Sequence, residues 1–170
     1  MILALDVAYT GDAQGYAVAI AFAEWTAAAP AATYAATVAP VPPYEPGAFY
    51  KRELPCLLAV LAQVELAEVG CVVVDGYVTL RAEERPGLGQ HLYEALGGRV
   101  PVVGVAKTKF AGVAPQVVAV RRGQSQNPLY ITSTGVTVSE AAGWVASMHG
   151  EYRFPTLLKY LDDLTRKTAV

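Results

Sequence analysis

The chain has 170 residues, of which 54% are hydrophobic, and its mean hydropathy is +0.32. This length and composition predict a single domain, residues 1–170, with a substantial core. The net charge of −2 argues against a protein held to nucleic acid by bulk electrostatics alone, although bound divalent cations would reverse the charge locally.

The apolar segments are too short for a membrane protein. No stretch reaches the roughly 18 uninterrupted apolar residues of a membrane helix. The first residues carry no basic segment, and Asp6 interrupts their apolar run, so they do not resemble a secretory signal. We therefore expect a cytoplasmic protein with no membrane partner. Cys56 and Cys71 lie in apolar runs, which favours buried free thiols over a disulfide or a metal site.

The first half of the chain predicts strands followed by a helix. Residues 1–10 form an apolar run typical of a buried strand, and residues 15–24 and 33–40 alternate small and larger apolar side chains. Three such strands in succession predict an antiparallel meander. A proline-rich loop at 41–47 precedes a helical pattern from about 48 to 68, with Pro55 near its start, where proline is best tolerated.

The second half alternates strands and helices. Residues 69–75 are almost entirely apolar, which favours a central parallel strand. A charged loop at 81–86 and a short helix at 87–96 lead to another buried strand at 100–107. Segments 116–121 and 128–132 flank a polar turn and predict a hairpin. Ser139 is expected to cap a helix that runs to about His149, and residues 156–167 form a final amphipathic helix.

This order of elements resembles the ribonuclease H-like fold. It implies an α/β protein with a mixed central sheet, three antiparallel strands and then parallel strands, flanked by helices. In that fold the first strand is central and the fourth lies parallel beside it, so Asp6 and Asp75 would be neighbours. Open α/β sheets bind ligands at the carboxyl ends of their strands, where these two residues would lie.

Five apolar or amphipathic segments each contain one charged residue that is a candidate for a functional site. They are Asp6, Glu53, Asp75, Lys107 and Asp162. An ionised carboxylate in an apolar strand costs several kcal/mol unless it is paired. Three or four carboxylates gathered at one place indicate a hard divalent cation, and with it phosphate chemistry.

The chain resembles the endonuclease V family, metal-dependent nucleases that act at inosine, over nearly its whole length. The motifs are short, but their order and spacing together are specific. The matching stretches are Asp6-Val7-Ala8-Tyr9, Tyr44-Glu45-Pro46-Gly47, Arg52-Glu53-Leu54-Pro55, Val74-Asp75-Gly76, Gly87-Leu88, His91-Leu92, Gly104-Val105-Ala106-Lys107, Ser133-Thr134-Gly135, and Arg153-Phe154-Pro155 leading to Asp162.

The resemblance implies a catalytic set. Asp6 and Asp75 would be the core metal ligands. Glu53 from the first helix would complete a Mg²⁺ site, with Mn²⁺ as the alternative ion. Asp162 from the last helix would add a ligand or hold a metal-bound water. Lys107 would contact the scissile phosphate or orient the attacking water. The implied reaction cuts DNA or RNA 3′ of inosine, in DNA repair, and leaves 5′-phosphate and 3′-hydroxyl ends.

The resemblance also implies substrate-binding residues. Tyr44, Pro46 and Gly47 would belong to a wedge loop, in which Tyr44 fills the gap left by a flipped base. Gly47, Gly76 and Gly87 would let backbone amides approach a base edge closely.

The residues around the catalytic set differ from the family pattern and leave alternatives open. Tyr77 and Val78 stand where the family has His-Gly, and Val136 stands where it has histidine. Cleavage is therefore better supported than inosine specificity. Another ribonuclease H-like structure-specific nuclease and a non-cleaving nucleic-acid-binding homologue remain alternatives. The choice between DNA and RNA, the choice between Asp162 and Asp163, and the oligomeric state also stay open.

Overall fold

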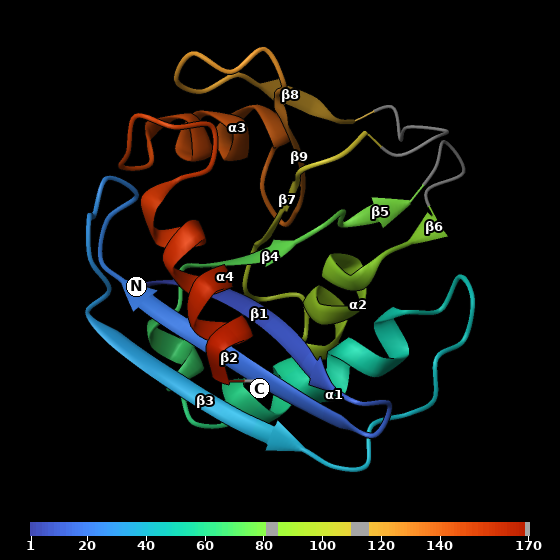
Figure 1. The fold of residues 1–170 in the computed structure, drawn as a ribbon. Coiled ribbons are helices and arrows are strands. Elements are labelled where there is room, and N and C mark those ends of the chain that lie inside the picture. Colours follow the sequence, from blue (N-terminus) through green and yellow to red (C-terminus); the bar gives the residue numbers. More distant parts are fainter. Residues whose placement is uncertain (81–84, 110–115, 169–170) are drawn as a thin grey trace.

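A mixed seven-stranded sheet forms the centre of the protein (Figure 1). The computed structural model describes residues 1–80, 85–109 and 116–168. The strand order is β3-β2-β1-β4-β7-β9-β8. The strands are β1 (Ile2–Thr10), β2 (Gln14–Phe22), β3 (Ala32–Val38), β4 (Cys71–Asp75), β7 (Val102–Ala106), β8 (Val118–Val120) and β9 (Leu129–Thr134).

The strand directions confirm the expected mixed sheet. Strands β1, β2 and β3 form an antiparallel meander, and β1, β4 and β7 run parallel to one another. Strand β9 returns antiparallel to β7, and β8 pairs antiparallel with β9, as the hairpin expected at 116–121 and 128–132 requires. In the parallel register Leu5 lies opposite Val74, so the next residues, Asp6 and Asp75, follow at neighbouring strand positions.

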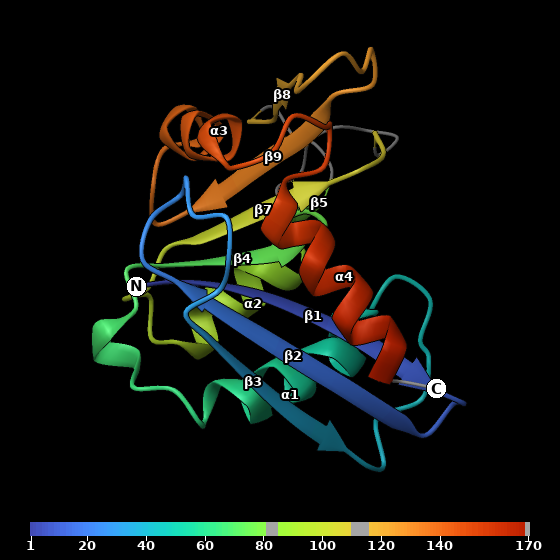
Figure 2. The same ribbon diagram turned by 60° about the vertical axis from the view of Figure 1, so that its left-hand side comes forward.

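Two pairs of helices cover the two faces of the sheet (Figure 2). Helices α1 (Tyr50–Leu61) and α2 (Leu88–Ala95) pack against one face, and α3 (Val138–Ser147) and α4 (Thr156–Thr168) against the other. Side chains alternate across a strand. Leu3 and Leu5 of β1 therefore enter the core under α1 and α2, whereas Ile2 and Ala4 enter the core under α3 and α4.

The helix expected at 48–68 is shorter than predicted. Helix α1 ends at Leu61, and a separate 3₁₀ turn, η1, spans Leu66–Glu68. Between them Glu65 has an extended backbone, and its side chain accepts a hydrogen bond from the amide of Ala67. A carboxylate that caps the following turn competes with helix continuation, which is why the apolar periodicity alone overestimated the length.

The predicted cap at Ser139 is also wrong. Thr137 is the N-cap residue of α3: its hydroxyl accepts from the amide of Glu140 at 3.3 Å and donates to the Glu140 carboxylate at 2.6 Å. Of the charged loop expected at 81–86, residues 81–84 lie outside the described residues. Arg85–Pro86 forms the short strand β6, which pairs with β5 (Thr79–Leu80).

Two further expectations concern the apolar character of the chain. Cys56 and Cys71 are buried and unbridged, as their apolar surroundings predicted. Within the described ranges, none of the helices combines the length and the apolarity that crossing a lipid bilayer would require.

Candidate nuclease active site

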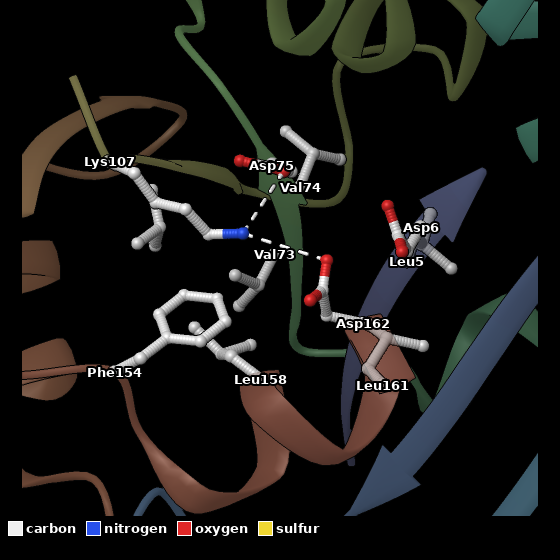
Figure 3. Close-up of a pocket in the computed structure, with 11 residues that line it drawn as sticks. Leu5, Asp6, Val73, Val74, Asp75, Lys107, Phe154, Leu158, Leu161 and Asp162 are labelled. Carbon is white, nitrogen blue, oxygen red and sulfur yellow. Dashed lines mark ion pairs between the residues drawn. The ribbon is translucent and has the colours of Figure 1, made fainter. Parts of the chain in front are cut away.

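Three charged side chains, on or just after three adjacent strands, lie on one face of the sheet. Each comes two residues after a core residue: Asp6 after Ala4 of β1, Asp75 after Val73 of β4, and Lys107 after Val105 of β7. Ala4, Val73 and Val105 all belong to the core under α3 and α4. Because side chains alternate along a strand, the three charged residues continue the same face towards solvent. The strand order β1-β4-β7 then sets them side by side (Figure 3).

Helix α4 brings a fourth charged residue to this face. Lys107 Nζ lies 3.6 Å from Asp162 Oδ1 and 3.9 Å from Asp75 Oδ2 (Figure 3). The ammonium also lies 4.4 Å from the centre of the Phe154 ring, a cation–π contact. Burial raises the pKa of Asp75, and the nearby Lys107 ammonium opposes that rise. Lys107 thus supplies the positive charge between two carboxylates.

The neighbouring acid, Asp163, points away from this group. It pairs with Lys159 one helical turn earlier. Asp162 instead lines a hollow together with Asp6, Asp75 and Lys107, and it also pairs with Arg166 at 3.2 Å. Adjacent residues on a helix face directions about 100° apart, so only one of the two can reach the sheet.

Asp6 lies half-buried between the sheet and α4. Burial raises its pKa from 3.8 to about 6, and a hydrogen bond with the Thr165 side chain opposes the rise. Thr165 is fully buried, and its hydroxyl also lies 2.8 Å from the Leu161 carbonyl oxygen. Thr165 was not among the functional residues expected from the sequence. It follows Asp162 by three residues and so lies on the same helix face, which is the pattern that would have indicated it.

Glu53 approaches the pair Asp6 and Asp75 from the opposite face of the sheet. It lies in the first turn of α1 and borders a second hollow together with both aspartates. Its pKa is raised from 4.5 to about 8, mainly by burial and in smaller part by the charges of Asp75 and Asp6. Asp6 and Asp75 therefore border two hollows, one with Glu53 and one with Asp162 and Lys107.

This donor set fits a hard divalent cation in its chemistry. All four acidic side chains offer oxygen ligands. Burial is the main cause of the raised pKa values of Asp6 and Glu53, so a nearby cation would stabilise the ionised form of both carboxyl groups. Within residues 1–80, 85–109 and 116–168, however, no three acidic, histidine or cysteine side chains already form a metal-binding cluster. Holding a cation would therefore require these side chains to rotate towards one another.

The loop after Asp75 is anchored by two residues that the sequence analysis did not select as functional. The hydroxyl of Thr132 on β9 accepts a hydrogen bond from the Val78 amide at 2.9 Å. Gly104 on β7 allows the loop to approach, since a Cβ there would lie only 2.5 Å from the Gly76 carbonyl oxygen and 2.6 Å from the Thr132 hydroxyl. Such an anchor fixes the chain direction directly after Asp75.

The turn that carries Lys107 is held from both sides. The Tyr77 hydroxyl donates to the Thr108 carbonyl at 2.8 Å, and the Arg153 guanidinium donates to the carbonyl oxygens of Lys107 and Pro128. Two successive carbonyls of the turn are thus tied to separate elements. Tyr77, which departs from the family pattern, has a definite structural contact in this chain.

The expected substrate-binding residues lie in two groups. Tyr44, in the loop with Pro46 and Gly47, is 61% exposed and contacts the ring of Phe49, which in turn contacts Tyr9 at the end of β1. The backbone of Gly47 has a φ of +76°, a conformation that glycine adopts easily.

Gly76 and Gly87 form the second group. The Gly76 amide donates to the Val105 carbonyl at 3.0 Å, and the Gly87 amide donates to the Val78 carbonyl at 2.9 Å. Both amides, which were expected to approach a base edge, are therefore already engaged within the fold.

Comparison with known proteins identifies the family. The endonuclease V family model matches residues 1–162. Endonuclease V of Xanthomonas oryzae pv. oryzae (strain PXO99A) is 28% identical over 187 residues, which cover 98% of this chain and 77% of that protein.

Two solved structures share the fold. Endonuclease V from Bacillus subtilis has a TM-score of 0.79 at 21% identity, covering 98% of this chain and 79% of its own. Ciona intestinalis endonuclease V, bound to a 24mer DNA that contains an inosine followed by a ribo-adenosine, has a TM-score of 0.77 at 16% identity, covering 98% and 84%. With the family model extending over nearly the whole chain, the protein belongs to the endonuclease V family and is, as a member, an endonuclease.

Proposed function

We propose that this chain, acting as a single domain, is a divalent-cation-dependent endonuclease of DNA repair that cuts DNA or RNA on the 3′ side of inosine. One observation carries the proposal: four carboxylates and one lysine line two adjoining hollows at the carboxyl ends of the parallel strands, in a chain of the endonuclease V family. Mg²⁺ is the proposed cation, with Mn²⁺ as the alternative.

The residues that would hold the cation follow from the two hollows. Asp6 and Asp75 border both, so they would be the shared ligands, with Glu53 on one side and Asp162 on the other. Bound there, a divalent cation would activate the attacking water and neutralise charge on the leaving oxygen. Carboxylates that share a cation no longer repel one another, which would offset the cost of burying Asp6 and Glu53 in ionised form.

Lys107 has a separate role in this proposal. Its ammonium now neutralises Asp75 and Asp162, and a cation held by these aspartates would release it. The freed ammonium would then contact a non-bridging oxygen of the scissile phosphate as a point charge. Phe154 beneath the ammonium, and the ties on the Lys107 turn, limit how far it can move.

The Tyr44 loop would recognise the distorted strand. The exposed Tyr44 ring, supported by Phe49, would stack in the gap that a flipped base leaves. Base–aromatic stacking contributes about 1–3 kcal/mol per base, which offsets part of the unstacking cost.

One observation favours a second candidate, a structure-specific nuclease with a different base preference. The amides of Gly76 and Gly87 both donate to carbonyl groups within the fold, and Val78 beside them is fully buried. Fewer backbone donors then remain to read the edge of an inosine base than the family pattern implied.

The test is a strand-cleavage assay on end-labelled oligonucleotides with one inosine, in DNA and in RNA, with and without Mg²⁺. We expect a single cut 3′ of the inosine that depends on the cation and is lost in the Asp75→Asn variant. Uncut inosine substrates, while a known family enzyme cuts them in parallel, would refute the proposal. Cleavage of branched or hybrid duplexes in place of inosine strands would favour the second candidate. Binding without any cleavage would indicate a non-cleaving homologue.

A further inference from the structure

We propose that a basic hollow next to Lys107 binds the nucleotides on the 3′ side of the cut. This inference rests on the proposed function for its polarity. The basic hollow, as we call it here, has a volume of about 380 Å³, and its walls include Lys107, Lys109, Asn127, Pro128, Tyr130 and Arg153.

The charge of the basic hollow differs from that of the whole chain. Lys107, Lys109 and Arg153 line it, and among the described residues no aspartate or glutamate does, although the chain carries a net charge of −2. A hollow of about 340 Å³ at the opposite edge of the sheet has a mixed lining, with Glu65 and Arg99. Positive charge concentrated at one hollow of an acidic protein indicates an anionic ligand.

The basic hollow and the active-site hollow share Lys107 as a wall residue. Lys107 lines both the basic hollow and the hollow that holds Asp6, Asp75 and Asp162. A strand whose phosphate contacts Lys107 in the active site would therefore meet the basic hollow with its next nucleotide. The volume of about 380 Å³ is at the low end of ligand pockets, which span about 300–1,000 Å³, and fits a short segment rather than a duplex.

The order of the strands decides which side of the cut enters the basic hollow. Tyr44 connects through Phe49 to Tyr9 at the end of β1, whereas Tyr130 belongs to β9, beyond β7. Along the sheet edge the order is thus the Tyr44 loop and Asp6, then Asp75, then Lys107, then the basic hollow. With inosine at the Tyr44 loop and the cut on its 3′ side, the strand leaves the active site in the 3′ direction into the basic hollow.

The lining offers the contacts that a single strand needs. Lys109 and Asn127 are exposed and can reach a phosphate or a base edge, and the half-buried Tyr130 presents an aromatic ring. Proteins that bind single strands without sequence preference use basic side chains along the nucleic-acid backbone and aromatic rings on which the bases stack. Arg153 contributes charge, although its guanidinium also holds the Lys107 and Pro128 carbonyls in place.

The test varies the length of the substrate on each side of the cut. Fluorescence anisotropy in EDTA, where no cleavage interferes, would measure binding of inosine oligonucleotides with 3′ arms of zero to four nucleotides. Lys109→Ala is the test variant, because Lys109 is exposed and lies outside the proposed catalytic set. Arg99→Ala is the matched control, since it removes one exposed positive charge at the opposite edge of the sheet.

We expect Lys109→Ala to weaken binding of long 3′ arms roughly two- to tenfold, the range of one hydrogen bond, without affecting substrates that lack the arm. The slope of log affinity against log salt should fall by about 0.7, the value for one phosphate contact on a single strand. Arg99→Ala should leave both quantities unchanged. Equal weakening for all arm lengths, or dependence on the 5′ arm instead, would overturn the inference.

A second measurement separates this inference from the proposed activity. A 5′-phosphorylated tetranucleotide mimics the 3′ product, and its binding requires neither inosine nor cleavage. If the protein cuts inosine strands but Lys109→Ala and Lys109→Glu bind the tetranucleotide like the native chain, the basic hollow is not a subsite and the activity stands. If cleavage fails but tetranucleotide binding depends on Lys109, the subsite stands and the proposed activity does not.

Discussion

Lys107 and Asp162 form an ion pair across the active site, with Nζ 3.6 Å from Oδ1, although one follows β7 and the other belongs to α4 (Figure 3). The same ammonium lies 3.9 Å from Asp75. Lys107 therefore neutralises the aspartates to which the proposed cation must bind. A competition between lysine and cation for the same carboxylates follows from this arrangement.

This competition predicts the behaviour of Lys107→Met, which removes the ammonium and keeps an apolar stem over Phe154. Cleavage should fall roughly 100- to 1,000-fold, the cost of losing one electrostatic contact to the transition state. Mn²⁺ affinity, measured by calorimetry, should rise because Asp75 and Asp162 lose a competing cation. Lys159→Met is the control, since within the described part of the chain Lys159 forms its ion pair with the outward-facing Asp163. Weaker Mn²⁺ binding in Lys107→Met would contradict the competition.

Replacing Asp6 should separate stability from activity. Burial raises the pKa of Asp6 from 3.8 to about 6, so its ionised form destabilises the fold at neutral pH without a cation. Asp6→Asn keeps the size and can still hydrogen-bond Thr165. We expect the free energy of unfolding to rise by about 1–3 kcal/mol at pH 8, while cleavage is lost.

Urea denaturation in EDTA and the strand-cleavage assay measure the two effects of Asp6→Asn. Asp163→Asn is the matched control, because Asp163 is exposed and Lys159 holds its pKa below the usual range. If Asp6→Asn loses more stability than the control, the ionised Asp6 carboxylate does not destabilise the fold.

The pH dependence of stability follows from Asp6 and Glu53 together. Their pKa values are raised from 3.8 to about 6 and from 4.5 to about 8, so between about pH 4 and pH 8 the folded state binds more protons than the unfolded state. The unfolding free energy in EDTA should therefore decrease as pH rises through this window and level off above it. Thermal unfolding from about pH 5 to pH 9 measures the trend.

Two additions sharpen the pH experiment. Glu53→Gln should reduce the decrease most between about pH 6 and pH 8, because Glu53, with a pKa of about 8, loses its proton in that range. Mg²⁺ should stabilise the protein increasingly as pH rises, because cations bind ionised carboxylates and compete with protons. A flat profile in EDTA would refute the burial of these two carboxyl groups.

Gly104 should be sensitive to the smallest enlargement. A Cβ there would lie 2.5 Å from the Gly76 carbonyl oxygen, so Gly104→Ala must displace the loop that follows Asp75. We expect a loss of about 1–3 kcal/mol in unfolding free energy together with reduced cleavage. Gly143→Ala in α3 is the control: nothing lies within 4 Å of its Cβ, and it should stabilise the helix by about 0.5–1 kcal/mol. Equal stability of the two variants would contradict this packing.

Much of the sheet could be predicted because local patterns carry the information. Apolar runs of strand length separated by turn residues indicated β1, β2, β3, β4 and β7, and their order indicated the mixed sheet. The wrong predictions concern helix ends, where a capping side chain rather than the apolar periodicity sets the boundary. Helix α1 ends at Leu61 and Glu65 caps a separate turn, and Thr137 rather than Ser139 caps α3.

The roles of the individual charged residues remain predictions, but their positions can be compared with expectation. Asp6 within β1 and Asp75 at the end of β4 were expected to be neighbours, and the register of these two strands brings their backbones together. The hydrogen bonds of the Gly76 and Gly87 amides could not be predicted in the same way, because they depend on carbonyl groups elsewhere in the fold that pack against these amides. No pattern within the loops themselves reports such contacts.

The sequence by itself determined the order of elements, the family, and the set of charges at Asp6, Glu53, Asp75, Lys107 and Asp162, because these depend on residue type and spacing. Only the tertiary structure decided that Asp162 rather than Asp163 faces the sheet, that Lys107 lies between two aspartates, and that Thr132, Thr165 and Gly104 support the site. These contacts join segments far apart in the chain, and their distances depend on how α4 and β9 pack against the sheet rather than on any local pattern.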